Sequence, residues 1–64
     1  MGPYTRQIRR LLGAAGYEFE REGKGDHEIW RNPETGKRVT IDVNCRNRHT
    51  ANKILRDAGL AKAF

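Results

Sequence analysis

Two stretches of this chain carry apolar side chains at the spacing of an amphipathic helix, one near each end. Positions i, i+3, i+4 and i+7 are apolar in both, so each stretch predicts a helix with one buried face. The apolar positions are Ile8, Leu11, Leu12 and Ala15 in the first stretch and Ala51, Ile54, Leu55 and Ala58 in the second. Thr5 and Thr50 stand where a side chain can cap each helix, and Gly16 and Gly59 stand where a left-handed residue can end it. Any other regular structure must therefore lie between these helices.

The periodicity changes to two between the helices. Residues 17–20 and 39–43 alternate apolar and polar side chains, and this pattern predicts two strands with one buried face each. Residues 27–30 predict a further strand, bounded by turn sequences at residues 23–26 and 32–36. We therefore expect an α+β fold in the order α-β-β-β-α, with a three-stranded antiparallel sheet and both helices packed on one face.

The register of the first hairpin decides which residues face the helices. If Glu22 pairs with His27, then Trp30 lies opposite Phe19 and faces the helices. Ile29 then shares the other face with His27. A slip of one residue reverses this assignment, because successive side chains of a strand point to opposite faces.

Length and cysteine content narrow the classes of protein to which the chain can belong. A chain of 64 residues buries only a small core, so we expect residues 1–64 to form one domain. No apolar run approaches the length of a membrane span or a secretory signal. The single cysteine, Cys45, cannot form an internal disulfide, which fits a reducing compartment. These features favour a cytoplasmic protein with no membrane partner.

The net charge of +5 is unevenly distributed along the chain. Residues 1–16 hold three basic residues and no acid, and residues 37–64 hold seven basic residues against two acids. Residues 17–36 instead hold six acids against three basic residues. The basic ends favour a polyanionic partner, nucleic acid above all. The acidic stripe on the first strand is expected to be a solvated face, and its members are Glu18, Glu20 and Glu22.

His27 is the candidate residue for chemistry. It follows a glycine-rich turn and begins a strand, where a large substrate has room to approach. Histidine takes and returns protons near neutrality, because its ordinary pKa is about 6.5. RNA carries its own nucleophile in the 2′-hydroxyl, so cleavage needs a base, an acid and nearby cations, but no metal. The alternative is that His27 is merely a surface residue of the turn.

Four basic residues are the candidate phosphate contacts of an RNA partner. Arg46, Arg48 and Lys53 cluster around the start of the second helix, where backbone N–H groups also favour an anion. Lys24 lies in the turn before His27. We expect no metal and no cofactor.

Two other pairs of residues are expected to be structural. Cys45 and His49 are four residues apart, but a pair without a third ligand does not predict a zinc site. Tyr17 and Trp30 are expected in the core rather than on a base-stacking surface, because the chain has few other large apolar residues.

The order and spacing of these elements resemble the HicA toxin family over almost the whole chain. The matching parts are Gly25-Asp26-His27, Trp30 in the next strand, a Pro-x-x-Gly turn at residues 33–36, Val39-Thr40-Ile41, and Thr-Ala-Asn-Lys-Ile-Leu-Arg-Asp-Ala-Gly at residues 50–59. The resemblance implies a fold like that of double-stranded-RNA-binding domains, ribosome-independent cleavage of mRNA, and neutralisation by a HicB antitoxin. It also implies that His27 takes the catalytic position of the Gly-x-His step, on a turn formed by Gly25 and Asp26.

Two places depart from the family pattern. Asp26 replaces the usual small hydroxyl residue before the histidine. Residues 44–50 read Asn-Cys-Arg-Asn-Arg-His-Thr, where the family commonly has a histidine, lysines and a Gly-Thr step. Asp26 either holds His27 in one tautomer or closes the turn. Two functions therefore stay open: a toxin that cleaves mRNA with a single histidine, and a non-catalytic module that binds double-stranded RNA by shape and phosphate contacts.

Overall fold

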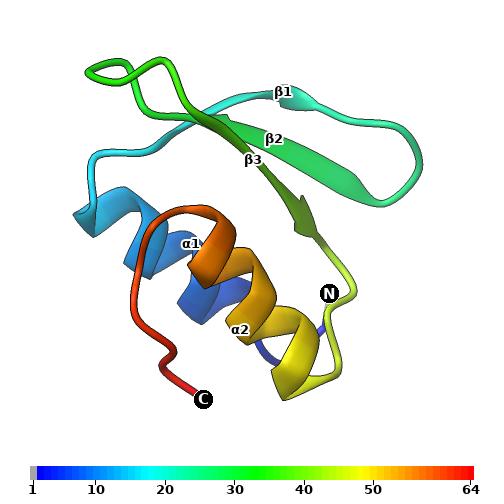
Figure 1. The fold of residues 1–64 in the computed structure, drawn as a ribbon. Helices are drawn as coiled ribbons and strands as arrows, with labels where there is room; N and C mark the ends of the chain where they lie inside the picture. Colours follow the sequence, from blue (N-terminus) through cyan, green and yellow to red (C-terminus); the bar gives the residue numbers. More distant parts are fainter. Residues whose placement is uncertain (1) are drawn as a thin grey trace.

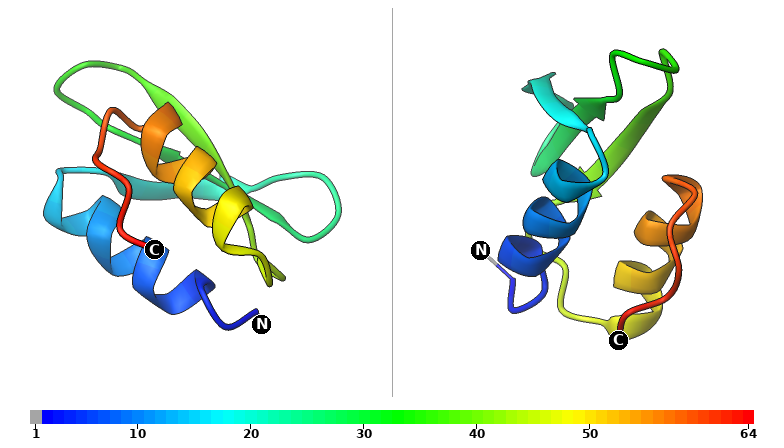
Figure 2. Two further views of the ribbon diagram at one scale, coloured as in Figure 1. Left: turned by 60° about the horizontal axis from the view of Figure 1, so that its bottom comes forward. Right: turned by 90° about the vertical axis from the view of Figure 1, so that its left-hand side faces the viewer.

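The computed structural model describes residues 2–64 and contains two helices and three strands in the expected order (Figure 1). They are α1 (Thr5–Ala14), β1 (Glu18–Glu22), β2 (His27–Arg31), β3 (Arg38–Asp42) and α2 (Arg48–Asp57). The strands form one antiparallel sheet in the order β1-β2-β3, so β1 and β3 are its edges. Both helices lie on the same face of the sheet, and the other face is open (Figure 2). The predicted α-β-β-β-α fold is confirmed.

The core forms where β3 lies over the two helices. Ile8 and Leu12 of α1, Ile41 of β3 and Leu55 of α2 are completely buried. Val39 joins them from two residues earlier in β3, as the alternation of a strand requires. The predicted buried faces of both helices and of the third strand are therefore confirmed. The buried face predicted for the first strand is wrong within β1, where every residue is exposed and Phe19 is 50% exposed; only Tyr17, just before the strand, is buried.

Both helices are followed by the predicted glycines. Gly16 and Gly59 have φ angles of 94° and 79°, in the left-handed region that glycine adopts without strain. After α1, the backbone N–H of Tyr17 donates to the carbonyl oxygen of Leu12 at 2.9 Å. The buried Tyr17 hydroxyl then donates to the carbonyl oxygen of Ala58 at 3.0 Å, which links the ends of the two helices.

The predicted threonine caps are wrong at both helices. Thr5 is the buried first residue of α1, and its hydroxyl donates to the carbonyl oxygen of Val43 at 2.7 Å. This tertiary acceptor replaces the N–H groups of its own helix as the partner of the hydroxyl. At α2 the cap is Asn47, whose side-chain oxygen accepts from the N–H of His49 at 2.7 Å. Thr50 already lies inside that helix.

The first hairpin has the predicted aromatic pair but a different register at its turn. Phe19 pairs with Trp30, and Trp30 packs half-buried against the core as expected. Glu22 pairs with Glu28 and not with His27, because the register of β1 shifts by one residue after Phe19. One extra residue in a strand is a β-bulge, which leaves the pairing before it intact and displaces the pairing after it.

The alternation of β2 places neighbouring residues on opposite faces of the sheet. His27 and Ile29 lie on the open face, together with their β3 partners Asp42 and Thr40. Glu28 lies between them in sequence and points to the helix side, where it meets α1. The prediction that His27 and Ile29 share the face away from Trp30 is confirmed.

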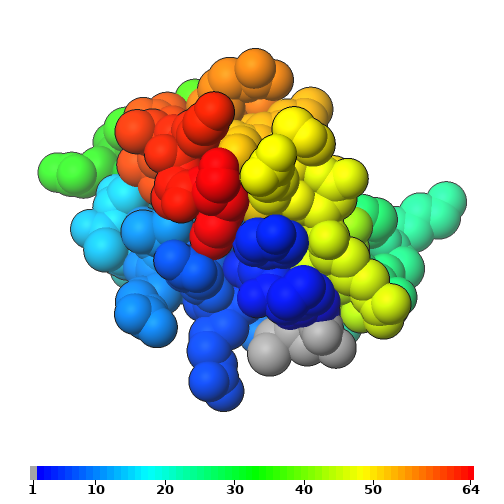
Figure 3. All heavy atoms as spheres, turned by 90° about the horizontal axis from the view of Figure 1, so that it is seen from below, coloured from blue at the N-terminus to red at the C-terminus, as the bar shows by residue number. Residues whose placement is uncertain are grey.

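The C-terminal residues pack against the helices and the N-terminal segment (Figure 3). The Asn52 side chain donates to the carbonyl oxygen of Phe64 at 3.0 Å and accepts from the N–H groups of Ala63 and Phe64 at 3.2 and 3.1 Å. The Phe64 ring meets Tyr4 edge-on with ring centroids 5.0 Å apart. One amide side chain therefore holds the end of the chain against α2.

Candidate active site

The turn before β2 fixes the orientation of the His27 ring. The side chain is exposed, and its Nδ1 atom lies 2.8 Å from the carbonyl oxygen of Lys24. A carbonyl oxygen can only accept a hydrogen bond, so Nδ1 is the nitrogen that carries the proton. In the neutral ring, Nε2 then keeps its lone pair and is free to accept a proton from a substrate.

Two glycines shape this turn. Gly25 has a φ angle of 68°, which an L side chain adopts only with strain. A Cβ at Gly23 would lie 3.3 Å from the His27 Cβ and 3.3 Å from a terminal carbon of Ile29. The N–H of Gly23 also donates to the carbonyl oxygen of His27 at 2.8 Å. The backbone therefore approaches His27 so closely that a Cβ at residue 23 would require His27 or Ile29 to shift.

Asp26 joins the turn to the loop after β3. Its carboxylate accepts from the side-chain amide of Asn44 at 2.7 Å, and its carbonyl oxygen accepts from the N–H of Val43 at 2.8 Å. The contact that orients the His27 ring comes instead from the backbone of Lys24. The charged side chain before the histidine thus ties two loops together.

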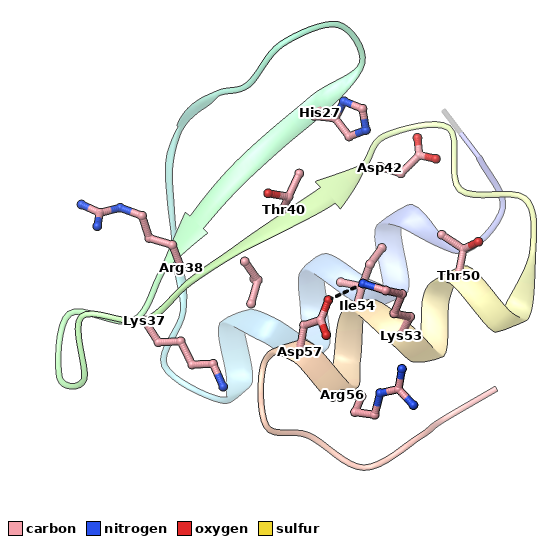
Figure 4. A pocket seen from close by; sticks show the side chains of 11 residues that line it. His27, Lys37, Arg38, Thr40, Asp42, Thr50, Lys53, Ile54, Arg56 and Asp57 are labelled. Atoms are coloured by element: carbon pink, nitrogen blue, oxygen red, sulfur yellow. Dashed lines mark hydrogen bonds and ion pairs between the residues drawn. The ribbon is translucent and has the colours of Figure 1, made fainter.

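A groove of about 820 Å³ runs between the free edge of β3 and α2, with His27 near one end (Figure 4). Val39 and Ile54 provide apolar lining. The charged lining residues are mostly basic, and they are His27, Lys37, Arg38, Lys53, Arg56, Asp42 and Asp57. The groove therefore offers a positively charged path that leads to an exposed imidazole.

The basic residues of the groove lower the pKa of an acidic neighbour, Asp57. The Lys53 ammonium donates to its carboxylate at 2.9 Å. This hydrogen bond, and then the charges of Lys53, Arg56 and Lys37, lower the pKa of Asp57 below its ordinary value. Basic residues thus outnumber acidic ones in the groove, and Lys53 is the one in direct contact with Asp57.

Asp42 is the carboxylate that the sheet places beside His27. The two residues are direct partners across β2 and β3. The neighbouring pair carries the hydrogen bond from Val43 to Asp26, so His27 and Asp42 form a non-hydrogen-bonded pair, in which side chains approach more closely. The Asp42 carboxylate accepts from the N–H of Asn44 at 2.9 Å. Asp42 was not among the predicted site residues, although the strand register would have identified it.

The structure brings some of the predicted phosphate contacts to His27 and leaves others apart. Lys53 lines the same groove, and Lys24 touches the ring through its carbonyl oxygen. Arg46 and Arg48 are exposed in the loop before α2 and at its first residue, outside the lining of this groove.

Three cations that line the groove were not predicted from the sequence, and they are Lys37, Arg38 and Arg56. Arg56 follows Lys53 by three residues on a predicted helix, a spacing that already indicated one shared face.

An ion pair anchors β2 on the side opposite His27. The Arg9 guanidinium of α1 donates to both carboxylate oxygens of Glu28, at 3.0 and 2.6 Å. The Trp30 indole N–H donates to the same carboxylate at 3.1 Å. Partial burial acts to raise the pKa of Glu28, but the hydrogen bonds from Arg9 and Trp30 and the Arg9 charge outweigh it, and the pKa is lowered.

The acidic stripe of β1 is only partly a solvated face. Glu20 and Arg38 form a two-pronged ion pair, with the Arg38 Nε atom 2.9 Å from the nearer carboxylate oxygen. The hydrogen bond from Arg38 lowers the pKa of Glu20, although the Arg38 side chain is exposed and that of Glu20 is partly so. One groove cation is therefore tethered across the open face of the sheet.

Residues 5–60 match the family described as the HicA toxin of bacterial toxin-antitoxin systems. The chain belongs to the HicA toxin family. The match covers both helices and the whole sheet, including the Gly-x-His step and the groove beside it. No curated protein and no solved structure gives a significant match.

Membership in the HicA family identifies the chain as a toxin of the toxin-antitoxin type. The helices of residues 2–64 are too short and too polar to cross a lipid bilayer. The resemblance in motifs and the family match agree, and both include His27.

Proposed function

We propose that this HicA family member is an endoribonuclease that cleaves mRNA with His27 as its proton carrier. The observation that supports this role most directly is the contact between the His27 Nδ1 atom and the Lys24 carbonyl oxygen, at 2.8 Å. It leaves Nε2 as the free nitrogen of an exposed ring at the end of a basic groove. A general base needs this combination of a fixed tautomer and access to substrate.

The proposed reaction uses the nucleophile that RNA itself carries. Nε2 of neutral His27 takes the proton of the 2′-hydroxyl, the 2′-oxygen forms a bond to phosphorus, and the bond from phosphorus to the 5′-oxygen breaks. The leaving oxygen takes a proton from solvent or from the imidazolium. The products are a 2′,3′-cyclic phosphate and a 5′-hydroxyl. The step needs no cofactor, and one positioned proton carrier typically contributes ~10²- to 10⁴-fold in rate.

The groove cations suit the binding of the phosphate chain. Lys37, Lys53 and Arg56 line the groove. Cations placed near the scissile phosphate stabilise the charge that develops on its oxygens. Lys24, Arg46 and Arg48 extend the basic surface, and we propose that they contact phosphates on either side of the site.

We further propose that the chain is neutralised by a HicB-like antitoxin and acts in the cytoplasm, where mRNA is found. An antitoxin that presents acidic side chains to the basic groove would also associate quickly, because complementary charge steers the encounter. The neighbouring gene is the first place to look for it.

One observation favours a non-catalytic RNA-binding module of the same fold. His27 is the one imidazole that lines the groove among the described residues, whereas His49 lines a second hollow of about 480 Å³ on α2, which shares Lys53 and Arg56 with the groove. No second imidazole is therefore placed to act as an acid in the same groove. A module of this kind would bind double-stranded RNA through its backbone and leave it intact.

Substitution of His27 separates the two functions. Purified wild type, His27→Ala and His27→Gln are incubated with labelled RNA in the presence of chelator, and binding is measured in parallel. We expect both variants to bind RNA and neither to cleave it. His49→Ala is the matched control and should cleave like wild type. Equal cleavage by His27→Ala would refute the catalytic role, and binding without cleavage by the wild type would favour the non-catalytic module.

A further inference from the structure

The free edge of β3 presents unpaired backbone groups along the groove. β3 pairs with β2 alone. The hydrogen bonds from Val43 to Asp26 and from Asn32 to Lys37 show which residues face β2, because the bonded pairs of an antiparallel ladder alternate. By this alternation the backbone groups of Arg38 and Thr40 point away from β2. Among residues 2–64, they make no backbone hydrogen bond to another element.

The two edges of the sheet differ in how well they are protected. The β1 edge carries a bulge and the acidic stripe, both of which discourage another strand from pairing there. β3 pairs with β2 over five consecutive residues without a bulge, and it contains no proline. Natural proteins usually cover or distort such a regular edge. The unprotected edge is also the one that borders the groove.

The groove next to this edge suits a strand whose side chains alternate in character. An added strand lies about 4.8 Å from its neighbour, and its side chains point alternately to the two faces of the sheet. On the helix side it would meet the apolar lining from Val39 and Ile54, and on the open side it would meet Arg38. Lys53 and Arg56 line the same groove from α2. Apolar side chains on one face and acidic side chains on the other would match these surroundings.

We propose that the antitoxin inserts an extended acidic segment as a fourth strand on the β3 edge, and so covers the groove beside His27. The inference rests on the proposed toxin function for the existence of this partner. A peptide fits the edge better than RNA, because the edge offers both N–H donors and carbonyl acceptors at the spacing of a strand. Phosphate oxygens accept hydrogen bonds but cannot donate to the Thr40 carbonyl. Such an added strand would exclude RNA from the groove.

A proline at Thr40 tests this mode of binding. Thr40→Pro removes one outward N–H but no hydrogen bond to β2, and proline is tolerated at such edge positions. Thr40→Val is the matched control, because it changes the side chain and keeps the N–H. The antitoxin is titrated against both variants, and folding is checked by circular dichroism. We expect Thr40→Pro to weaken the complex roughly tenfold or more and Thr40→Val to bind like wild type.

Hydrogen exchange of the wild-type complex gives a second test that needs no substitution. The amides of Arg38 and Thr40 should exchange quickly in the free toxin and slowly in the complex. The amides of Val39 and Ile41 should be protected in both states, since they face β2. A stable complex with unchanged exchange at Arg38 and Thr40 would overturn strand addition while the toxin function stands.

Three other outcomes would also overturn the proposal. Equal protection of the two amides by RNA alone would assign the edge to nucleic acid. Protection that rises with toxin concentration, without antitoxin, would assign it to a second copy of this chain. Failure of the wild-type toxin to bind the antitoxin would remove both the partner and the inference. If Thr40→Pro does not fold, the exchange measurement decides.

Discussion

The His27 ring is oriented by the backbone of Lys24, whose carbonyl oxygen lies 2.8 Å from Nδ1. Many catalytic histidines are oriented by a carboxylate, which also stabilises the charged ring. A neutral carbonyl sets the tautomer without adding a full negative charge. The turn between β1 and β2 is therefore part of the candidate site, and we expect its glycines to influence the proposed chemistry as well as folding.

Gly25→Ala should reduce RNA cleavage more than RNA binding. The left-handed φ of 68° disfavours a Cβ, so the substitution should cost about 1 kcal/mol of stability and shift the Lys24 carbonyl away from Nδ1. Gly13→Ala is the control, because a Cβ at this helical position meets no atom within 4 Å. It should raise stability by roughly 0.5–1 kcal/mol and leave cleavage unchanged. Urea unfolding and single-turnover cleavage of each variant test both statements.

The Arg9–Glu28 ion pair should make stability depend on pH. The folded-state pKa of Glu28 is lowered from an ordinary value of 4.5. As the pH falls, the unfolded chain therefore takes up the proton first, so the stabilisation is complete above pH 4.5 and is lost as the pH falls through the lower folded value. Glu28→Gln and Arg9→Met should each destabilise the protein by about 1–3 kcal/mol near pH 7 and flatten this decline. Urea titrations between pH 7 and pH 2 provide the measurement, and an equally steep decline in Glu28→Gln would contradict the assignment.

The groove cations and the loop cations should have separable effects on RNA. Lys53→Gln with Arg56→Gln should weaken RNA binding, reduce its salt dependence and slow cleavage, because these residues line the groove that leads to His27. Arg46→Gln with Arg48→Gln should also weaken binding and reduce the salt slope, but cleavage at saturating RNA should stay near the wild-type rate. Binding titrations at several salt concentrations, combined with single-turnover kinetics, distinguish the two pairs. Salt-independent binding would contradict both expectations.

The 2′-hydroxyl should be required at the cleaved position. An RNA with a single 2′-deoxy substitution at the mapped cleavage site should bind normally and resist cleavage there. The 5′ fragment of the unmodified RNA should carry a cyclic phosphate, which mass spectrometry detects. Efficient cleavage at the deoxy position would show that water is the nucleophile and that His27 has another role.

Asn47→Ala should destabilise the protein, and Thr50→Ala should not. Asn47 caps α2 through its bond to the His49 N–H at 2.7 Å, so its loss should cost about 1 kcal/mol. Thr50 is exposed inside the helix, where alanine is at least as favourable. Thermal or urea unfolding of the two variants separates them.

Sequence periodicity predicted the elements well and their ends less well. The apolar spacing of each helix and the alternation of Val39 and Ile41 depend on local geometry, which short stretches of sequence express directly. Thr5 was misplaced because its hydroxyl finds a tertiary acceptor on Val43, and only the folded chain reveals that partner. The bulge in β1 escaped prediction for a related reason, since a single extra residue leaves no distinct pattern among alternating charged side chains.

His27 and Lys53 of the candidate site were predicted from the sequence, but most of the groove around them was not. His27 stands out because a glycine-rich turn precedes it. The groove lies between β3 and α2. A loop separates these two elements in the sequence, so their relative position depends on packing of the core. The strand register alone would have paired Asp42 with His27, but only that packing brings Arg56 to the groove.

Two adjacent residues of β2 face opposite sides of the sheet. His27 faces solvent, and Glu28 faces the helices, where it binds Arg9. A single-residue insertion or deletion next to this pair would exchange their environments, leaving the imidazole inside and the carboxylate outside. Such a change would remove the anchor and the candidate proton carrier together, even if every residue type were kept. The number of residues in this hairpin is thus as strictly constrained as the identity of its functional residues. Variants of this toxin should tolerate substitutions in the hairpin more readily than changes in its length.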